Sequence, residues 1–588
     1  CRKTKTVSLD EAASKRILSE YGIPVVEEAI TADENTAVAV AGKMGYPVVL
    51  KGFGSSLAHK TEMGLVRVNL ADEHQVRTAF SQIKTAGGEA WEGCLVQPMV
   101  TGQREVVAGL IRDPQFGPVV MFGLGGIFAE ALKDVVFRIA PLTEEQARDM
   151  MSDLSARNLL GAFRGQAPAD TAQLARVLTG LSRLGTDFPD IKEVDINPLI
   201  ISADGRITAV DALVVLTDDL PDGGGVPDPE AAQQKSDKTV QDLKVMTRPQ
   251  SIAVVGVART PAGPFPGIYR CMRDFGYVGR LYPINPGAPD IDGAKSYPSL
   301  KALPEKVDLV ILSISADRVP AALDECIEAG CRNVHIFTSG FAESGEPEGI
   351  RLQEEIRQIA LNGGLNIIGP NCMGIHVPAL RVLTWKNASK ISGPVGMVSQ
   401  SGGHAQDFAH LANRMGLYFS KIISFGNAVT MDSTDFLPFF AQDADTRIIS
   451  MYLEGVKDGR TLLEQVTRIN RKKPVVILKG GLTESGARTV ASHTGSLAGG
   501  ASIWKGFFRQ TGAVQVNSLD EMAQTIMAFE HLPPVRGKRV AILGTGGGIG
   551  VAAADSCART GLEMPQLSPE TMDQLRQYIP PAGNMIRN

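Results

Sequence analysis

The chain has 588 residues, of which 44% are hydrophobic and 21% charged, and a formal net charge of −5. This length exceeds what one hydrophobic core can fill, so we expect three or four domains. The acidic balance argues against a nucleic-acid binder, which needs a basic face. No apolar run reaches the roughly 18 to 20 residues of a membrane span.

The cysteines and the N-terminus bear on the cellular compartment. None of the seven cysteines forms a CxxC motif or a metal-like pairing with histidine. This predicts reduced thiols in the cytoplasm rather than a disulfide framework. The N-terminal stretch CRKTKTVSLDEAASK has no apolar signal core and no initiator Met, so we expect a fragment of a longer chain.

The first strand patterns of the chain carry polar residues at their ends. Lys51 ends the apolar strand YPVVLKGFG, and burying an ammonium group is costly unless it meets an anion. Gln97 and Glu105 flank a second strand, and Asn197 and Asp211 lie on two later, successive strands. Such oxygen ligands, together with phosphate oxygens, suit Mg²⁺. The set predicts an ATP–Mg site; an Asn-Pro turn and an ordinary strand-end acid are the alternative.

In the same region, MFGLGGIFAEAL places Gly125 and Gly126 before a helical pattern. Small residues let the backbone approach a ligand, and the free N–H groups of a helix start favour anions. This predicts a phosphate-binding turn, with a plain turn as the alternative.

A polar, Pro- and Gly-rich stretch, TDDLPDGGGVPDPEAAQQKSDK, then indicates a linker. After it, short Val/Ile runs alternate with helical patterns, which predicts a parallel sheet with helices on both faces. The first turn, AVVGVARTPAG, lacks a full G-x-G-x-x-G, because Gly256 is followed by Val257, Ala258 and Arg259. It favours a mononucleotide-like site, such as the phosphoadenosine end of coenzyme A, over a dinucleotide site.

A second series of strand and helix patterns begins at GPVGMVSQSGG. In MVSQSGGHAQDF a buried-type strand ends at Ser399, and Gln400, Ser401, Gly402 and Gly403 precede a helical pattern. The amides of these small residues can cradle a phosphoryl group. A plain turn is again the alternative.

The stretch ARTVASHTGSLAG places His493 among small residues, with too little apolar bulk for a core strand. We expect a loop that a reaction partner can reach. A neutral imidazole is a good nucleophile at pH 7. Together with the two glycine-led helix starts, His493 suggests a phosphate handed between two sites.

The C-terminal stretch KRVAILGTGGGIGVAAADSCARTGL starts one more strand–helix unit. One such unit cannot bury its own faces, so we expect an incomplete module. Its glycines also fit tight helix–strand packing. The incomplete module is compatible with a homo-oligomer.

Four long motifs in compatible order resemble those of the nucleoside-diphosphate-forming (ADP-forming) acyl-CoA synthetases, in the superfamily of succinyl-CoA synthetase and acetate–CoA ligase. The resemblance implies an α/β fold with an ATP-grasp domain, a Rossmann-like CoA-binding domain and flavodoxin-like ligase domains with parallel sheets. The implied boundaries are 1–217 for the ATP-grasp domain, 218–246 for the linker, 247–385 for the CoA-binding domain, 386–535 for the ligase domain and 536–588 for the incomplete second ligase domain.

The resemblance also assigns catalytic residues. SHTGSLAG matches the phosphohistidine loop of the family, which makes His493 the phosphate carrier, and MYLEGVKDG makes Glu454 the residue that holds its imidazole. SSLAHKTEMGLV makes His59 a second phosphate-shuttling histidine, with a surface histidine as the alternative. VDINPL and VDAL match the metal-binding pair, Asn197 and Asp211.

Further matches concern coenzyme A and the acyl group. The CoA-contacting strand ends of relatives map to Gly256, Val257, Ala258, Asn285, Pro286, Ser313 and Ser315, and the thioester end maps to Asn371 in IGPNCMGI. Asn427 in SFGNAVTMD and Trp385 in RVLTWKNASK lie toward the acyl site, although a packed domain junction is an equal alternative for Trp385. Two features depart from many relatives: the ATP-grasp region comes first, and Thr430 stands where they have an acid.

The resemblance implies an ATP-dependent ligase that joins a small carboxylic acid to coenzyme A through phosphohistidine and acyl phosphate, with ATP, coenzyme A and Mg²⁺. One alternative is a ligase-coupled lyase whose CoA adduct, for example of dimethylsulfoniopropionate, undergoes elimination. Another is a non-catalytic regulator that binds coenzyme A or nucleotide. Relatives act on acetate, on aryl acids such as ferulate and on dimethylsulfoniopropionate, so the acid stays open.

Overall fold

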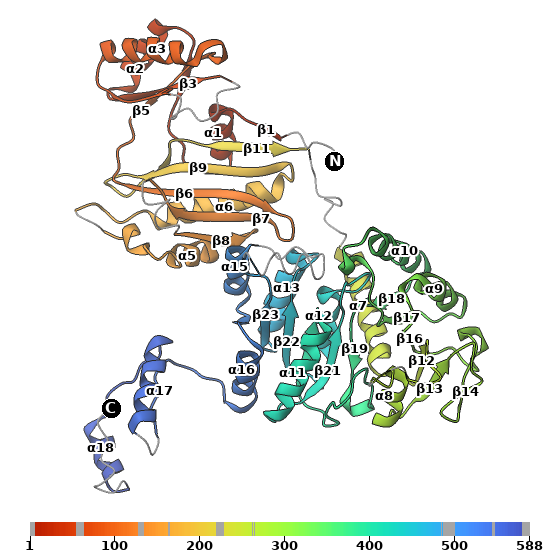
Figure 1. Cartoon of the computed structure of the whole chain (residues 1–588). Helices are drawn as coiled ribbons and strands as arrows, with labels where there is room; N and C mark the ends of the chain where they lie inside the picture. The colour runs from red at the N-terminus through yellow and green to blue at the C-terminus, as the bar shows by residue number, and fades with distance from the viewer. Residues whose placement is uncertain are drawn as a thin grey trace. The chain divides into compact units, whose positions relative to one another are not determined.

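The computed structural model describes residues 6–54, 64–126, 134–162, 165–218, 229–261, 263, 265–483, 485, 500–543 and 547–578 (Figure 1). Two predicted catalytic residues, His59 and His493, lie outside these ranges. By its internal contacts the chain divides into two compact units, Cys1–Ile526 and Met527–Asn588.

The N-terminal part of the first unit contains two antiparallel sheets. The smaller sheet has the strand order β2-β5-β3-β4, and helices α2 and α3 pack against it around the buried side chains of Val48, Leu50 and Val76. Its elements are β2 (Ala29–Thr31), α2 (Glu34–Met44), β3 (Val48–Phe53), β4 (Val66–Leu70), α3 (Glu73–Gly87), the 3-10 turn Gly88–Ala90 and β5 (Gly93–Pro98).

The larger sheet has the order β1-β11-β9-β6-β7-β8, and β10 pairs with β9. Helix α6 packs on β6 and β7 through the fully buried side chains of Leu174, Leu178 and Leu181. Its elements are β1 (Thr6–Ser8), α1 (Glu11–Glu20), β6 (Arg104–Asp113), β7 (Gly117–Leu124), β8 (Val135–Ile139), α5 (Glu144–Ser152), the 3-10 turn Arg157–Leu160, α6 (Thr171–Asp187), β9 (Ile191–Ile201), β10 (Ile207–Ala209) and β11 (Leu213–Thr217).

A five-stranded parallel sheet follows, in the order β13-β12-β16-β17-β18. Successive side chains of β12 point to opposite faces of the sheet. Ile252 packs with α8 on one face, and Ala253 packs with α9 and α10 on the other. Helices therefore cover both faces, as predicted. The elements are β12 (Ser251–Val255), α8 (Ile268–Phe275), β13 (Arg280–Ile284), the hairpin β14 (Asp290–Ile291) and β15 (Ala294–Lys295), β16 (Leu309–Leu312), α9 (Val319–Glu328), β17 (Asn333–Ile336), α10 (Pro347–Gly363), β18 (Asn366–Ile368) and the 3-10 turns Leu300–Ala302, Ala316–Arg318, Ala342–Ser344 and Pro378–Leu380.

A six-stranded sheet completes the first unit, in the order β19-β21-β20-β22-β23-β24. All its pairs are parallel except the edge pair β19–β21. The central strands are buried at every position, which is why they read as unbroken apolar runs. The elements are β19 (Gly374–His376), β20 (Val395–Ser399), α11 (Gly402–Arg414), β21 (Phe419–Ser424), α12 (Ser433–Gln442), β22 (Ile448–Leu453), α13 (Gly459–Asn470), β23 (Val475–Lys479), α15 (Ala501–Thr511), β24 (Val514–Val516) and α16 (Leu519–His531).

The expected linker, residues 218–246, is not extended throughout. Its second half belongs to helix α7 (Pro229–Thr247), which packs against α12. Val240, Leu243 and Met246 of α7 are buried in the core shared with the six-stranded sheet. The polar composition gave no signal for this helix, because only one narrow face of it is apolar. The boundaries of the linker stay a prediction.

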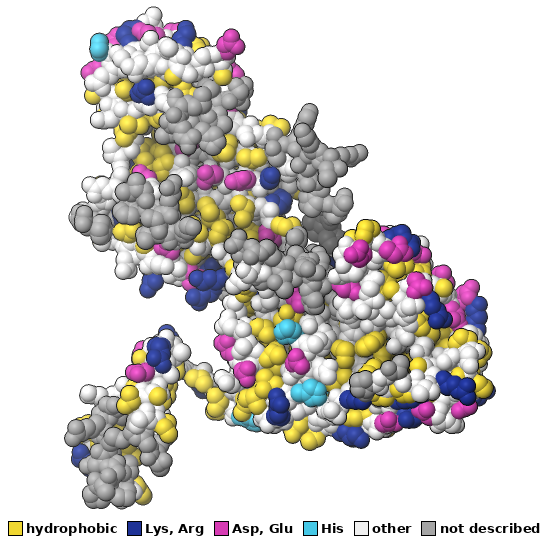
Figure 2. Space-filling view, in the orientation of Figure 1, with side chains coloured by type: hydrophobic (Ala, Val, Ile, Leu, Met, Phe, Trp, Pro, Cys, Tyr) yellow, Lys and Arg dark blue, Asp and Glu magenta, His cyan; other side chains and the backbone are white. Residues whose placement is uncertain are grey.

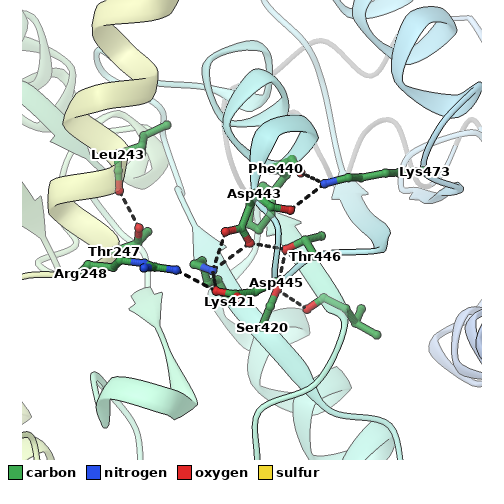
Figure 3. Close-up of polar contacts among 11 residues, drawn as sticks. Leu243, Thr247, Arg248, Ser420, Lys421, Phe440, Asp443, Asp445, Thr446 and Lys473 are labelled. Carbon is green, nitrogen blue, oxygen red and sulfur yellow. Dashed lines mark hydrogen bonds and ion pairs between the residues drawn. The ribbon is translucent and has the colours of Figure 1, made fainter.

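Ion pairs join the elements at the amino ends of β22 and β23 (Figure 3). The Lys421 ammonium, on β21, contacts Asp443 at 2.8 Å and Asp445 at 3.1 Å, and Arg248, just after α7, pairs with Asp445 at 3.0 Å. Lys473 donates to the main-chain carbonyls of Phe440 and Asp443 at 2.8 and 2.7 Å. This edge is opposite to the carboxyl ends of the strands, so the network serves packing rather than the candidate site.

The larger antiparallel sheet packs directly on helices of the six-stranded sheet. The rings of Phe116 and Trp504 meet edge to face, with centroids 5.3 Å apart. The side-chain amide of Gln510 accepts from the Ile139 N–H at 2.8 Å and donates to the Ile139 carbonyl at 2.9 Å. At Gly506 there is no room for a side chain, because a Cβ would lie 2.5 Å from the Phe137 carbonyl oxygen.

The second unit contains α17 (Gly547–Arg559) and α18 (Pro569–Arg576). Its described backbone pairing outside helices includes one isolated parallel bridge, Arg539–Glu563. Large apolar side chains such as Leu543, Ile549 and Val551 are exposed on it (Figure 2). That this segment begins a second ligase domain stays a prediction.

Within the described ranges, every helix falls short of the length or the apolar composition that a bilayer crossing requires. The cytoplasmic location stays a prediction.

Candidate active site

The turn between β20 and α11 forms one wall of a cavity of about 270 Å³. Ser401 caps the helix, since its hydroxyl accepts from the His404 N–H at 3.3 Å, and the Ser399 hydroxyl donates to the Ser401 carbonyl at 2.6 Å. The cavity is lined by Phe337, Ser339, Asn371, Cys372, Met373, Gln400, Ser401, Gly402, Gly403 and Gly426. The N-terminus of a 13-residue helix thus faces a space of ligand size, and its dipole and free N–H groups favour an anion there.

The opposite wall comes from the loop after β18, in the five-stranded domain. Asn371 adopts a left-handed conformation with φ 57°, and its side-chain amide donates to Asn427 at 3.4 Å. Gly426 is close to the same loop, because a Cβ there would lie 2.2 Å from the Pro370 carbonyl oxygen. The structure therefore brings Asn371 and Asn427 together, although 56 residues separate them in sequence.

Asn427 and Thr430, from the segment expected near the acyl group, are held by the five-stranded domain. The Asn427 amide donates to Gln353 at 2.8 Å and to Glu343. The Thr430 hydroxyl accepts from the Ile367 N–H at 2.8 Å. The residue that departs from many relatives thus contributes to the contact between two domains.

Glu454 follows β22 and is only 3% exposed. The side-chain oxygen of Gln400 accepts from the N–H groups of Glu454 and Gly455, at 2.8 and 3.0 Å. The Tyr452 hydroxyl donates to the Glu454 carboxylate at 3.0 Å. Burial, and then the Glu454 carboxylate, raise the pKa of Tyr452, so the phenol stays protonated as a donor. The turn predicted to cradle phosphate and the residue predicted to hold the imidazole are therefore one hydrogen-bonded unit.

Lys479, at the end of β23, was not singled out from the sequence. Its ammonium donates to the Glu454 carbonyl at 2.8 Å and lies 5.0 Å from the ring centroid of Trp504. Burial lowers its pKa to about 8, although the Glu454 charge opposes this shift. The signal was present, since KPVVILKGG ends a buried strand with lysine and glycine as YPVVLKGFG does at Lys51.

The segment that contains His493 starts and ends beside this unit. It follows β23, where the Gly480 N–H donates to the Leu453 carbonyl at 2.8 Å, and it leads into α15, which starts after Gly500. His493 itself lies outside the described residues. Both flanks of the segment thus lie at the carboxyl edge of the sheet, where Glu454 lies.

In the N-terminal part, Lys51 is buried in a cluster of charges. Its ammonium donates to Glu11 at 2.6 Å and to the Val210 carbonyl at 2.7 Å, and it lies 3.3 Å from an Asp211 oxygen. Burial alone lowers the pKa of Lys51, but Glu11 and Asp211 outweigh burial and raise it. Lys51 and Asp211, two residues of the predicted ATP–Mg set, thus lie together in the structure.

Sequence reasoning missed the partners of this pair. Lys15 donates to Glu11 and Glu28, both at 2.7 Å, and to the Gln97 side chain at 3.1 Å. The signal was the Glu11–Lys15 spacing of four residues on an expected helix, which favours an ion pair. Gln97 therefore joins the Lys51 cluster through Lys15 and Glu11.

Glu105, Gly125 and Gly126 lie together. The Gly125 N–H donates to the Glu105 carbonyl at 2.9 Å, and a Cβ at Gly126, where φ is 65°, would lie 2.9 Å from a Glu105 carboxylate oxygen. Glu105 thus packs closely on this turn, and the positive φ of Gly126 favours glycine there. The following residues, 127–133, lie outside the described ranges.

Asn197 lies on β9, as expected, but Asp211 lies two residues before β11 rather than on a strand. The register of these adjacent strands pairs Leu213 with Asp195. Burial raises the pKa of Asp195, and the nearby carboxylates of Glu193 and Asp211 raise it further. Among the described residues, however, no group of three or more His, Cys, Asp or Glu side chains is placed to hold a metal ion. Since the predicted pair supplies one carboxylate and one amide, further ligands would have to come from elsewhere.

The predicted CoA residues follow the carboxyl ends of adjacent strands β13, β12 and β16. Gly256 (φ 90°) must lack a side chain, because a Cβ would lie 2.3 Å from the Ser313 carbonyl. The Asn285 amide donates to the Val257 carbonyl at 2.8 Å. The set gathered at this edge is Gly256, Val257, Ala258, Asn285, Pro286, Ser313 and Ser315. Ligands of parallel sheets bind at such edges, where the strand order reverses, as it does at β12.

The sequence matches three protein families in chain order. Residues 1–216 match the ATP-grasp domain, residues 250–378 the CoA binding domain, and residues 392–529 the succinyl-CoA ligase like flavodoxin domain.

One relative matches nearly the whole chain. "Acetate--CoA ligase [ADP-forming] II" of Archaeoglobus fulgidus is 32% identical over 580 residues, 98% of this chain and 83% of the relative. The chain belongs to the ADP-forming acyl-CoA synthetase family. This synthetase is therefore an enzyme of the ligase class, and the predicted family and fold class are confirmed. Because one alignment spans the chain, the relative shares its domain order.

Two further proteins are similar to parts of this synthetase. The alpha subunit of "Acetate--CoA ligase [ADP-forming] II" of Pyrococcus furiosus is 38% identical over 340 residues, 58% of this chain and 74% of the subunit. A solved structure from Ca. Korarchaeum cryptofilum, acetyl-coenzyme A synthetase 1 with phosphate and ADP, is 34% identical with a TM-score of 0.54. That similarity covers 58% of this chain and 73% of the other.

The Trp385 side chain of this synthetase is packed in the protein interior. Its side chain is 1% exposed, and its ring centroid lies 4.9 Å from that of His376. It is not among the residues that line the 270 Å³ cavity. A part in acyl binding stays a prediction for Trp385.

A larger cavity, of about 350 Å³, contains none of the predicted site residues. It lies between Ala140, Pro141 and helix α13, where Arg460, Arg468 and Arg471 line it. The smaller cavity is the better candidate because it adjoins the Gln400–Glu454 unit.

Proposed function

We propose that this synthetase joins a small carboxylic acid to coenzyme A, with ATP converted to ADP and phosphate and with His493 as phosphate carrier. The observation that supports this is the bond of Gln400 to the amides of Glu454 and Gly455. This bond links the start of helix α11, which is suited to an anion, to the residue that carries the buried Glu454 carboxylate. Both flanks of the His493 segment lie beside it.

The steps balance as follows. An imidazole nitrogen of His493 attacks the γ-phosphorus of ATP; a P–N bond forms, and the P–O bond to the leaving ADP breaks. A carboxylate oxygen of the acid then takes the phosphoryl group, which gives an acyl phosphate and frees the imidazole. The CoA sulfur attacks the acyl carbon after losing its proton, a C–S bond forms, and phosphate leaves.

The described residues support the first two steps. The Glu454 carboxylate accepts the other imidazole N–H, which fixes the tautomer and stabilises positive charge on the ring. The Ser401–Gly403 amides at the start of α11 stabilise the phosphoryl group by preorganised dipoles. His404 follows that turn, and its ring stacks on Tyr452 at a centroid distance of 4.0 Å.

At the nucleotide, Lys51, Gln97, Glu105, Gly125 and Gly126 are proposed to bind ATP. Asn197 and Asp211 are proposed to hold Mg²⁺, which when bound neutralises charge on the phosphates. His59 is proposed as a second phosphate carrier near this site.

The domain assignment is part of the proposal. It places ATP in residues 1–217, CoA in 247–385, and the phosphate carrier in 386–535, with 218–246 between the first two and 536–588 as part of a second ligase domain. CoA lies along the strand ends from Gly256 to Ser315, with its thiol toward Asn371 and the acid toward Asn427. Acetate is the first acid to test, because the relative from Archaeoglobus fulgidus is an acetate–CoA ligase by name.

Labelling tests the proposal. Incubation with [γ-³²P]ATP is expected to give phosphoprotein that is acid-labile and base-stable, and His493→Asn is expected to abolish both label and acetate-dependent CoA consumption. His410→Asn is the control, since this histidine is outside the proposed site. Wild-type protein without label, or an active His493→Asn variant, would contradict the proposal.

A further inference from the structure

Two lysines bracket β23. Lys479 ends the strand and Lys473 comes just before it, and each ammonium donates to two main-chain carbonyls. The carbonyl partners of Lys479 are Glu454 and Gly480, at the carboxyl edge of the sheet. Those of Lys473 are Phe440 and Asp443, at the amino edge. Both ammonium groups thus contact main-chain carbonyls, but Lys479 is buried at the candidate active site and Lys473 is partly exposed at the opposite edge.

The Lys479 side chain is enclosed by groups of that site. It is 5% exposed, with the Trp504 ring 5.0 Å from its ammonium and the Glu454 main chain at 2.8 Å. The ionisable groups of this cluster, in the described part of the chain, are Glu454 and Tyr452 from the β22 end and His404 from α11. Lys479 brings an ammonium into this cluster, and the Glu454 carboxylate lies close enough to oppose the effect of burial on its pKa.

We propose that Lys479 is a positioning residue for phosphoryl transfer, which fixes the main chain at Glu454 and balances its charge so that the carboxylate keeps one orientation. This inference rests on the proposed function. It adds a residue that acts through Glu454 rather than on substrate. A lysine with a purely structural role can hold the main chain at either end of β23. Lys473 holds it at the amino end, away from the candidate active site.

Because the positioning charge is carried by an ammonium, phosphorylation depends on its protonation. Burial brings the pKa of Lys479 to about 8. The protonated form is present below this pH and is lost as the pH rises through it. The initial rate of phosphoprotein formation in the wild type is therefore expected to fall on the basic side of neutrality.

The experiment measures the initial rate of ³²P incorporation from [γ-³²P]ATP into the full chain, across the neutral and basic range. Lys479→Met is expected to slow labelling at neutral pH by at least about tenfold, as for loss of a hydrogen bond to a charged group, and to remove the fall near pH 8. Lys479→Arg, whose cation does not titrate in this range, is expected to recover part of the rate without the fall. Lys473→Met is the matched control, expected to lower stability while it leaves the pH profile unchanged.

The inference is overturned if Lys479→Met labels at the wild-type rate with the wild-type profile, or if Lys473→Met changes the profile equally. If Lys479→Met does not fold, the pH profiles of the labelling rate are compared between the wild type and Lys479→Arg. If the rate falls at basic pH in both proteins, the inference is overturned. Failure of the proposed function gives a different result, namely a wild type that takes up no label at any pH.

Discussion

Gln400 connects the turn before α11, where we propose that phosphate binds, to Glu454. Its single carbonyl oxygen accepts from two consecutive main-chain N–H groups, at 2.8 and 3.0 Å. Both donors are buried, so this oxygen satisfies groups that water cannot reach. One side chain thus sets the distance between the proposed phosphate site and the carboxylate that serves it.

Gln400→Leu is expected to lower the free energy of unfolding by about 2 kcal/mol, because the amides of Glu454 and Gly455 lose their acceptor. It is also expected to slow phosphoprotein formation more than it weakens ATP binding. Urea unfolding and the labelling assay measure the two effects. Gln465→Leu is the control, since the Gln465 carbonyl oxygen is buried without a hydrogen-bond partner and its amide donates only to Thr434. Equal loss of labelling in both variants would contradict the assigned role.

Single residues of the site were predictable where a local motif carries them. Gln400 and Glu454 were each singled out from their own stretch, but their hydrogen bond spans 54 residues and has no local signature. The sequence analysis singled out Lys51 but not Lys479, although both end buried strands. For Lys51, the sequence analysis did not identify Glu11 as the carboxylate that pairs with its ammonium, because Glu11 lies 40 residues away on a helix.

At the scale of elements, the amino ends of β21, β22 and β23 are joined by charge rather than by apolar contact. Lys421 and Asp443 are 3% and 7% exposed, and Asp443 also accepts from the Thr446 hydroxyl at 2.6 Å (Figure 3). Removing one partner of such a pair leaves an uncompensated buried charge. The packing of α12 against the sheet therefore depends on both charges.

Lys421→Met is expected to lower the free energy of unfolding by about 3 to 5 kcal/mol. Adding Asp443→Leu in the same chain is expected to restore part of this loss, because the unpaired carboxylate is then removed as well. Urea unfolding of the two single variants and the double variant measures the coupling. A double variant less stable than Lys421→Met alone would contradict this account of the network.

Strands that are buried on both faces were predicted well from the sequence, whereas a helix that is buried on only one face was predicted poorly. The strands of the two parallel sheets are continuous apolar runs, because both their faces are covered. Helix α7 was not predicted within the expected linker, because Val240, Leu243 and Met246 are its buried apolar residues in an otherwise polar stretch. A three-residue stripe is too weak a periodic signal to outweigh proline and glycine nearby.

At the scale of the whole first unit, the larger antiparallel sheet and the six-stranded sheet share one hydrophobic core. Phe116, Val119 and Ile139 from the former pack with Trp504 and Phe507 from the latter. The contact is close enough that a glycine is needed in α15, where Gly506 lies under Phe137. Separate sequence motifs do not predict such a contact, because it depends on how two domains pack.

Gly506→Ala is expected to destabilise the unit by about 1 to 3 kcal/mol, since the new Cβ meets the Phe137 carbonyl at 2.5 Å. Gly42→Ala is the matched control in helix α2, where a Cβ has no neighbour within 4 Å. There alanine is expected to stabilise by about 0.5 to 1 kcal/mol through helix propensity. Thermal unfolding compares the two variants, and a stabilised Gly506→Ala would contradict the close packing.

Gln510 gives this contact a second consequence. Among the strands that the structure describes, β8 lies at the end of its sheet and pairs on one side only, with β7. The primary amide of Gln510 pairs with both the N–H and the carbonyl of Ile139, as a strand residue would. A side chain from helix α15 therefore satisfies the backbone hydrogen bonds of β8 at Ile139. An unpaired edge strand could otherwise pair with another polypeptide and start aggregation.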